Sequence, residues 1–167
     1  MKIYLAADHN GFALKEKIKK WLNAWEYEYE DIGPFVFDPK DDYPDFIIPA
    51  ARAVAQDPDT RRAIILGFSG QAEAMTANRM KNVRASVYYG EPSALSDVGG
   101  KRTDKPRDLL VLTREDNDSN ILSLGAGFLS EKQVKEAITR WLKAPFTGQE
   151  RHIRRINKID QGIGNRE

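Results

Sequence analysis

A glycine-rich stretch in the middle of the chain combines residue types that can move protons beside a bound anion. It comprises residues 67–73, with the sequence GFSGQAE, and connects an apolar run to a helical pattern. Its glycines permit a tight turn whose N–H groups can face an anion at the start of a helix. Ser69 adds a hydroxyl, and Glu73 falls in the first helical turn, close to that anion. A plain strand-to-helix turn explains the pattern equally well, because the helix dipole favours an acidic residue there.

Neither of the common nucleotide-binding fingerprints is present in this stretch. The GxxxxGK[ST] loop is missing together with its lysine, and Phe68 and Ser69 interrupt a GxGxxG pattern. A nucleotide-binding domain is therefore the less favoured interpretation of the glycine-rich stretch.

Two further clusters place polar side chains at turns. Residues 8–11 (DHNG) follow the first apolar run, and residues 117–120 (NDSN) stand just before the last one. In open α/β sheets, ligands bind beyond the carboxyl ends of the strands. We expect both clusters to lie there, beside the glycine-rich stretch. On its own, a turn histidine such as His9 is more often a satisfied polar residue than a ligand.

A basic tail offers a different kind of chemistry. Arg151, His152 and Arg155 are spaced so that a helix would bring the two arginines to one face, with the histidine nearby. A planar guanidinium binds phosphate oxygens through two parallel hydrogen bonds. A solvated basic helix face is the simpler explanation for the tail alone. Without interleaved aromatic residues, its cations are poor evidence for nucleic-acid binding.

Strand-like and helix-like segments alternate along the chain and would position these clusters. Strands are predicted at residues 2–7, 26–32, 63–66, 83–89 and 121–124, and helices at 14–25, 44–55, 71–80, 107–116, 131–143 and 149–159. The inner strands are short and continuously apolar, whereas residues 26–32 alternate in the manner of an edge strand. This order predicts an α/β fold of the Rossmann-like, doubly wound type. It would have a mostly parallel five-stranded sheet with helices on both faces.

The composition limits the classes of protein further. The chain has 167 residues, 41% of them hydrophobic, and a net charge of +1, so one domain with a substantial core is expected and nucleic acid or membrane partners are not. The absence of cysteine excludes disulfides and thiolate chemistry, and two histidines make a histidine-rich metal centre unlikely to form. No apolar stretch is long enough to span a membrane. We therefore expect a cytoplasmic protein without a histidine-rich metal centre.

Five clusters, taken together, resemble the type B ribose-5-phosphate isomerase family, which also includes galactose-6-phosphate isomerase subunits. They occupy residues 8–12, 42–46, 67–70, 117–120 and 151–155. Each is modest, but their order and spacing through most of the chain are specific. The resemblance implies a Rossmann-like isomerase domain over residues 1–145 and a basic helix at residues 146–167 that packs at a dimer interface. It also implies a homodimer, or a pair of such dimers, with active sites between subunits and with no metal ion or other cofactor.

The resemblance further implies that the protein interconverts an aldose and a ketose phosphate, typically ribose 5-phosphate and ribulose 5-phosphate. One branch of the family uses a cysteine base where this chain has Gly67, and the other branch uses a glutamate that Glu73 matches. Ser69 matches a hydroxyl that handles protons on O1 and O2. The implied substrate-binding residues are Asp8, His9, Tyr43, Gly70, Gln71, Ala72, Ala74 and, from the neighbouring subunit, Asn117. The implied phosphate-binding residues are His9, Arg151, His152 and Arg155.

Two residues and one connection depart from the family pattern. Asp116 stands where the family has the histidine that opens the furanose ring, and as the acid in that step a carboxyl would need a raised pKa. Gly127 replaces an arginine that helps to bind the phosphate. The connection at residues 90–106 is longer than the family's. Four cations in or near it could replace the lost arginine: Lys101, Arg102, Lys105 and Arg107.

These departures leave two other functions open. The substrate of the isomerase could be a six-carbon sugar phosphate instead. Alternatively, the chain could be a sugar-phosphate-binding protein that has lost catalysis. Asp116 and Gly127, which replace a histidine and an arginine of the family pattern, motivate this alternative.

Overall fold

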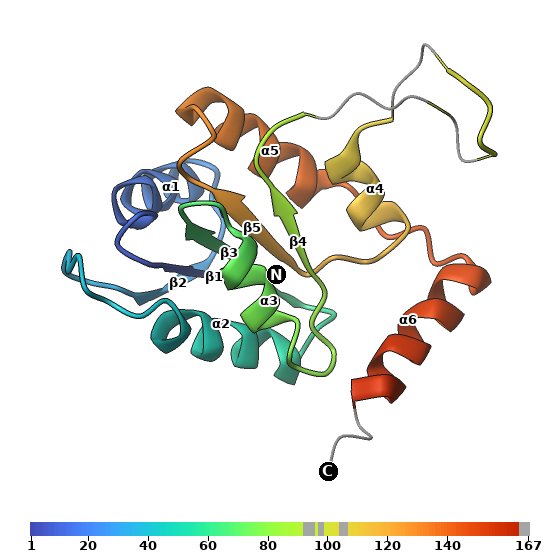
Figure 1. The fold of residues 1–167 in the computed structure, drawn as a ribbon, viewed down its shortest axis with the longest axis horizontal. Coiled ribbons are helices and arrows are strands. Elements are labelled where there is room, and N and C mark those ends of the chain that lie inside the picture. Colours follow the sequence, from blue (N-terminus) through green and yellow to red (C-terminus); the bar gives the residue numbers. More distant parts are fainter. Residues whose placement is uncertain (92–95, 97–98, 104–106, 164–167) are drawn as a thin grey trace.

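A parallel sheet with helices on both faces forms the body of the protein in a computed structural model (Figure 1). The structure describes residues 1–91, 96, 99–103 and 107–163. The strands are β1 (Lys2–Ala7), β2 (Tyr29–Gly33), β3 (Arg61–Gly67), β4 (Ala85–Tyr88) and β5 (Ile121–Gly125). The helices are α1 (Phe12–Ala24), α2 (Pro44–Gln56), α3 (Gln71–Ala77), α4 (Leu109–Glu115), α5 (Glu131–Lys143) and α6 (Glu150–Ile163).

The strand order is β2-β1-β3-β5-β4, and all four pairings are parallel. The three central strands are buried on both faces, which explains their continuous apolar runs. The alternating strand β2 lies at an edge, as predicted. From β1 the chain continues to β2 at one edge of the sheet, and from β3 it continues to β4 at the other edge before it returns to β5. A crevice is expected beyond the carboxyl ends of the neighbouring strands β1 and β3.

Two hydrophobic clusters cover the two faces of the sheet. On one face, α1 and α5 pack against the sheet around the fully buried Trp141. On the other face, α2 and α3 pack through small residues, among them Ala50, Ala51 and Ala77. Figure 1 shows these two helical layers on opposite sides of the sheet. The predicted doubly wound α/β fold is therefore confirmed.

Element boundaries differ from the prediction for identifiable reasons. β2 begins at Tyr29 rather than at residue 26, because Glu26 has a left-handed φ of 61° and ends the turn that follows α1. α3 ends at Ala77 rather than at residue 80, and Asn78 then exchanges two hydrogen bonds with the backbone of Ala85. α6 continues to Ile163, beyond the predicted residue 159.

The long connection after β4 is held at its two ends by one side chain of α5. Arg140 donates to Glu91 at 2.6 Å and to Asp108 at 2.8 Å. The two ends of the connection therefore lie close together. Within it, Ser96 and Arg102 form an isolated antiparallel bridge.

Candidate active site

The turn after β1 fixes the Asp8 carboxylate at the carboxyl edge of the sheet. Asp8 is buried, and one of its oxygens accepts the Gly11 N–H while the other accepts the Asn10 side-chain amide, both at 3.0 Å. Gly11 is required here, because a Cβ at this position would lie 2.5 Å from the Cβ of Leu66. The first predicted cluster therefore has a defined geometry at the expected edge.

His9 is bound to an acidic partner that the sequence analysis missed. Its Nδ1 lies 2.6 Å from Oδ1 of Asp41, and its backbone N–H donates to the same oxygen at 3.1 Å. This hydrogen bond raises the pKa of His9 above its usual value, although partial burial opposes the effect. Asp41 comes from the loop before α2, and no spacing rule connects it to residue 9. A more cationic His9 suits contact with an anionic ligand.

Glu73 is buried at the carboxyl edge of the sheet, beside the end of β3. Gly70 begins α3 with a left-handed φ of 74°, and the first turn of the helix then carries Glu73 back under the end of β3. Its carboxylate fills the space beside Gly67, where a Cβ would lie only 2.0 Å from Oε1. Glu73 is 4% exposed. Burial raises the pKa of this carboxyl, and the charge of Asp8 raises it further.

A raised pKa adapts Glu73 to proton transfer, because a carboxylate that holds a proton more tightly is a stronger base. Around it, the first three N–H groups of α3 have no partner within the helix. Among the predicted substrate-binding residues at this loop, Ala74 has its N–H engaged within the helix, because it donates to the Gly70 carbonyl. The same carbonyl accepts the Ser123 hydroxyl at 2.6 Å, which ties the loop to β5.

Two other predicted residues flank this loop. Ser69 is half-buried, and its hydroxyl oxygen accepts the Gln71 N–H at 3.4 Å. Tyr43 precedes α2 and packs partly against the hydrophobic cluster on that face of the sheet. The carboxyl edge therefore brings together Asp8 and His9 with the loop that carries Ser69 and Glu73.

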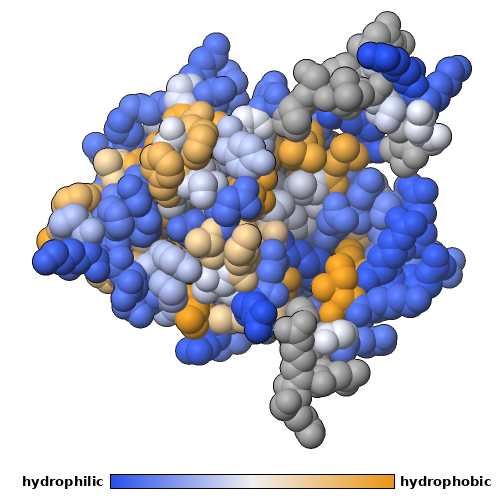
Figure 2. Space-filling view, viewed as in Figure 1, coloured by the Kyte–Doolittle hydropathy of each residue, from blue (hydrophilic) through white to orange (hydrophobic). Residues whose placement is uncertain are grey.

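The predicted position of residues 117–120 is wrong. They precede β5 and, because β5 runs parallel to β1 and β3, they lie at the amino edge of the sheet, opposite Glu73. There Asp116 and Asn117 line a cavity of about 500 Å³ together with His152 and Arg155 of α6. Apolar side chains of α6, among them Ile156 and Ile159, also line it, and Figure 2 shows apolar surface beside this helix.

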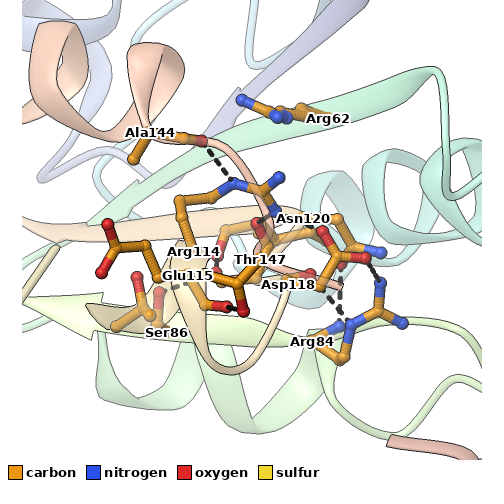
Figure 3. Close-up of polar contacts among 12 residues, drawn as sticks. Arg62, Arg84, Ser86, Arg114, Glu115, Asp118, Asn120, Ala144 and Thr147 are labelled. Carbon is orange, nitrogen blue, oxygen red and sulfur yellow. Dashed lines mark hydrogen bonds and ion pairs between the residues drawn. The ribbon is translucent and has the colours of Figure 1, made fainter. Parts of the chain in front are cut away.

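A half-buried ionic network fixes the turn that carries Asp116 and Asn117 (Figure 3). Asp118 has a left-handed φ of 47°, and its two carboxylate oxygens accept from Arg114 at 2.7 Å and from Arg84 at 2.8 Å. Arg114 also donates to the Ser119 carbonyl at 2.6 Å. Residues of α4 and of the segment before β4 thereby hold this turn rigidly.

His152 is the buried member of the basic tail, at 4% exposure, whereas Arg151 and Arg155 are exposed. Nε2 of His152 lies 3.6 Å from Oδ1 of Asp116. The same nitrogen accepts the Nε–H of Arg151 at 3.1 Å. The tail residues and Asp116 therefore form one group on the cavity wall.

Aromatic side chains surround Gly127, the position at which the family pattern has an arginine. A Cβ at Gly127 would lie 2.5 Å from the ring of Phe68. The exposed rings of Phe68 and Phe128 are 5.5 Å apart, and Tyr89 lies 6.2 Å from Phe128. Of the cations suggested as replacements, Arg107 pairs with Glu115 at 2.9 Å. Lys105 lies outside the described residues, and the replacement stays a prediction.

The described residues contain neither a membrane-spanning helix nor a cluster of metal ligands. No described helix is long and apolar enough to cross a membrane. Within the same ranges, no three acidic or histidine side chains converge as they would to hold a metal ion.

Known proteins share both the sequence pattern and the fold. A family model described as Ribose/Galactose Isomerase matches residues 3–98 and 108–159, which leaves out part of the long connection. The ribose-5-phosphate isomerase B of Mycolicibacterium paratuberculosis is 30% identical over 157 residues, covering 94% of this chain and 88% of that protein.

Solved structures of ribose-5-phosphate isomerase B are similar to the structure of this chain. The Mycoplasma genitalium ribose-5-phosphate isomerase B with bound ribulose-5-phosphate matches with a TM-score of 0.85 and 30% identity, over 99% of this chain and 97% of that one. The Clostridium thermocellum ribose-5-phosphate isomerase B matches with a TM-score of 0.81 and 31% identity, over 96% of both chains.

Proposed function

The chain belongs to the ribose/galactose isomerase family and is an aldose–ketose isomerase of sugar phosphates, and we propose that it interconverts ribose 5-phosphate and ribulose 5-phosphate. The observation that supports this proposal most directly is the buried Glu73 carboxylate in the space beside Gly67. It offers one base of raised pKa at the carboxyl edge, and isomerisation needs one base that serves two neighbouring carbons.

In the proposed reaction, Glu73 takes a proton from C2 of the open-chain aldose and returns it to C1. The intermediate is an enediolate, whose negative oxygens would face the N–H groups at the start of α3, which have no partner within the helix. Ser69 would pass the proton between O1 and O2. Asp8, fixed by Gly11 and Asn10, would hold a hydroxyl of the sugar. This scheme uses no metal ion and no cofactor.

We propose that the phosphate is held by His9 of one subunit and by Arg151 and Arg155 of another. One chain has the base at the carboxyl edge of its sheet and the arginines beside the cavity at the amino edge. A single site that uses both groups therefore requires two copies, and we propose a homodimer in the cytoplasm. The α6 segment, within residues 146–167, would bring its basic residues to the partner's crevice.

Mixing two inactive variants tests this arrangement. Glu73→Gln removes the base, and Arg151→Ala with Arg155→Ala removes the phosphate contacts, so each variant alone is expected to lose most of its isomerase activity. Mixed and allowed to exchange subunits, they should regain activity, because one site of each hybrid dimer has both native halves. The recovered rate should approach half the native rate per hybrid dimer. No recovery, although mass measurements show hybrid dimers, would place both halves in one subunit.

A substrate panel tests the reaction itself. Ribose 5-phosphate should be isomerised with the highest kcat/KM, and allose 6-phosphate and galactose 6-phosphate more slowly. The aromatic group around Gly127 is the observation that favours the six-carbon alternative, since it replaces a cation near the crevice with apolar surface. Faster turnover of a six-carbon substrate would support that alternative, and saturable binding without turnover would support a non-catalytic binding protein.

A further inference from the structure

His9, which we place at the phosphate, is held by a carboxylate that lies outside the five sequence clusters. Asp41 stands in the loop before α2, and its Oδ1 receives two hydrogen bonds from His9. They come from the backbone N–H at 3.1 Å and from Nδ1 at 2.6 Å. The side chain of Asp41 is 6% exposed, whereas that of His9 is 30% exposed. A buried carboxylate therefore holds one edge of the ring, and the other edge lies toward the surface.

The second oxygen of Asp41 shows what this carboxylate is for. Oδ2 is buried and has no hydrogen-bond partner among the described residues, and within the same ranges both donors to the carboxylate belong to His9. A buried carboxylate with an unpaired oxygen is unfavourable unless a positive charge lies close to it. Fastening the loop would need no charge, because a neutral side chain could accept the same backbone N–H. The arrangement therefore indicates that the charge of Asp41 serves the imidazole.

We propose that Asp41 is a positioning residue for phosphate binding, which holds the Nδ1 proton of His9 so that Nε2 is the nitrogen that donates to the phosphate. This inference rests on the proposed function. In the ligand-free protein, the amide nitrogen of Asn10 lies 2.9 Å from Nε2 and also donates to Asp8 at 3.0 Å. An amide nitrogen can only donate, so Nε2 carries no proton in this state and the ring proton is on Nδ1, toward Asp41.

Phosphate binding then changes the partner of Nε2. The ring takes up one proton from solvent at Nε2 and donates it in a hydrogen bond to a phosphate oxygen, while the Asn10 amide gives up its contact with the ring. The ring faces Asp8 at the end of β1 and Asp38 and Asp41 in the loop before α2. The hydrogen bond to Asp41 raises the pKa of His9, desolvation opposes this effect, and the charges of the three carboxylates raise the pKa further. The imidazolium therefore persists to a higher pH than that of an isolated histidine.

The affinity for ribose 5-phosphate at two pH values tests this role, measured by calorimetry in a Glu73→Gln background that binds without turnover. Asp41→Asn keeps an oxygen that accepts the His9 backbone N–H and the Nδ1 proton, but it removes the charge. At about pH 8, the ring in this variant is neutral and its Nε2 turns a lone pair to the phosphate, so binding should weaken about tenfold, as for loss of a charge-assisted hydrogen bond. At about pH 5.5, the ring is protonated in both proteins, and the variant should bind at least as tightly as its parent, because one negative charge has gone.

Asp38→Asn is the matched control. Asp38 lies in the same loop, is exposed, and accepts the Lys40 backbone N–H at 2.9 Å, not a proton of the ring. Loss of this screened charge should change the affinity by less than about twofold at either pH. If Asp41→Asn binds like its parent at both pH values, or more weakly by the same factor at both, the positioning role is overturned.

An NMR titration examines the pair without a substitution at position 41. The chain has two histidines, so His9 gives one of two sets of imidazole signals, and His9→Gln identifies it. The ¹⁵N shifts of the neutral ring should show the proton on Nδ1, and the titration midpoint should lie above 6.5. A neutral His9 with its proton on Nε2 would also overturn the proposal. Absence of isomerase activity in the native protein would instead contradict the proposed function, whatever the titration shows.

Discussion

Replacing Glu73 by glutamine should lower kcat for ribose 5-phosphate about a thousandfold and leave KM nearly unchanged. Glutamine has almost the same shape as glutamate, so it can occupy the space beside Gly67, but it cannot accept the C2 proton. General acid–base groups contribute factors of about a hundred to ten thousand in rate. A coupled assay of ribulose 5-phosphate formation measures the loss. Glu131→Gln is the control, since Glu131 stands in the first turn of α5 and is exposed.

The pH dependence of the native enzyme provides a second readout of the same group. Glu73 must be ionised to act as the base, and burial raises the pKa of its carboxyl above 4.5. The value of kcat/KM should therefore fall as the pH decreases through this raised pKa, at a pH higher than an exposed glutamate would give. An acid limb centred at or below 4.5 would contradict the assignment.

The same shift has a consequence for stability that separates loss of function from loss of fold. A carboxyl whose pKa is raised in the folded state destabilises that state once the pH exceeds the unfolded pKa. The Glu73→Gln variant should therefore match the native protein in free energy of unfolding well below pH 4.5. It should become the more stable of the two as the pH rises through 4.5 to the raised pKa. Urea unfolding at acidic and neutral pH checks this sign.

The sequence was sufficient to predict the fold because its strand patterns and its helix patterns indicated the same architecture. Apolar runs long enough for strands alternated with amphipathic helices, and the alternation of β2 placed it correctly at an edge. The turn after β1 and the glycine-rich loop were also placed correctly, since each directly follows a central strand. In a parallel sheet, such positions lie at the same edge whatever the rest of the chain does.

The parts that were not predictable depend on contacts between distant segments. Asp41 binds His9 across 32 positions, and Arg140 holds both ends of the long connection. The misplaced cluster at residues 117–120 had a simpler cause, because a turn before a strand lies at its amino end. The family resemblance already implied that Asn117 serves a neighbouring subunit. Its position at the opposite edge is consistent with that implication and not with a site formed by one chain.

A side chain added at Gly67 should disable the enzyme by displacing its base. An alanine Cβ would lie 2.0 Å from Oε1 and 2.2 Å from Cδ of Glu73, so the carboxylate must leave the space beside β3. We expect Gly67→Ala to lower kcat about a hundredfold, since the base would then stand away from both C1 and C2. Because Glu73 lies in the first turn of a helix at the carboxyl edge of the sheet, its side chain can turn away from β3, and the fold should survive.

A double-variant cycle isolates this steric cause from any other effect of the alanine. In a Glu73→Ala background the space beside Gly67 is vacant, and Gly67→Ala should then cost almost nothing further in residual activity or in unfolding free energy. Equal losses in both backgrounds would show that Gly67 matters for the backbone of β3 instead. The cycle also bears on the two branches of the family, because a cysteine at position 67 and a buried glutamate at position 73 would compete for one volume. A chain that uses the glutamate therefore needs glycine at position 67, and the absence of cysteine from this sequence agrees with that requirement.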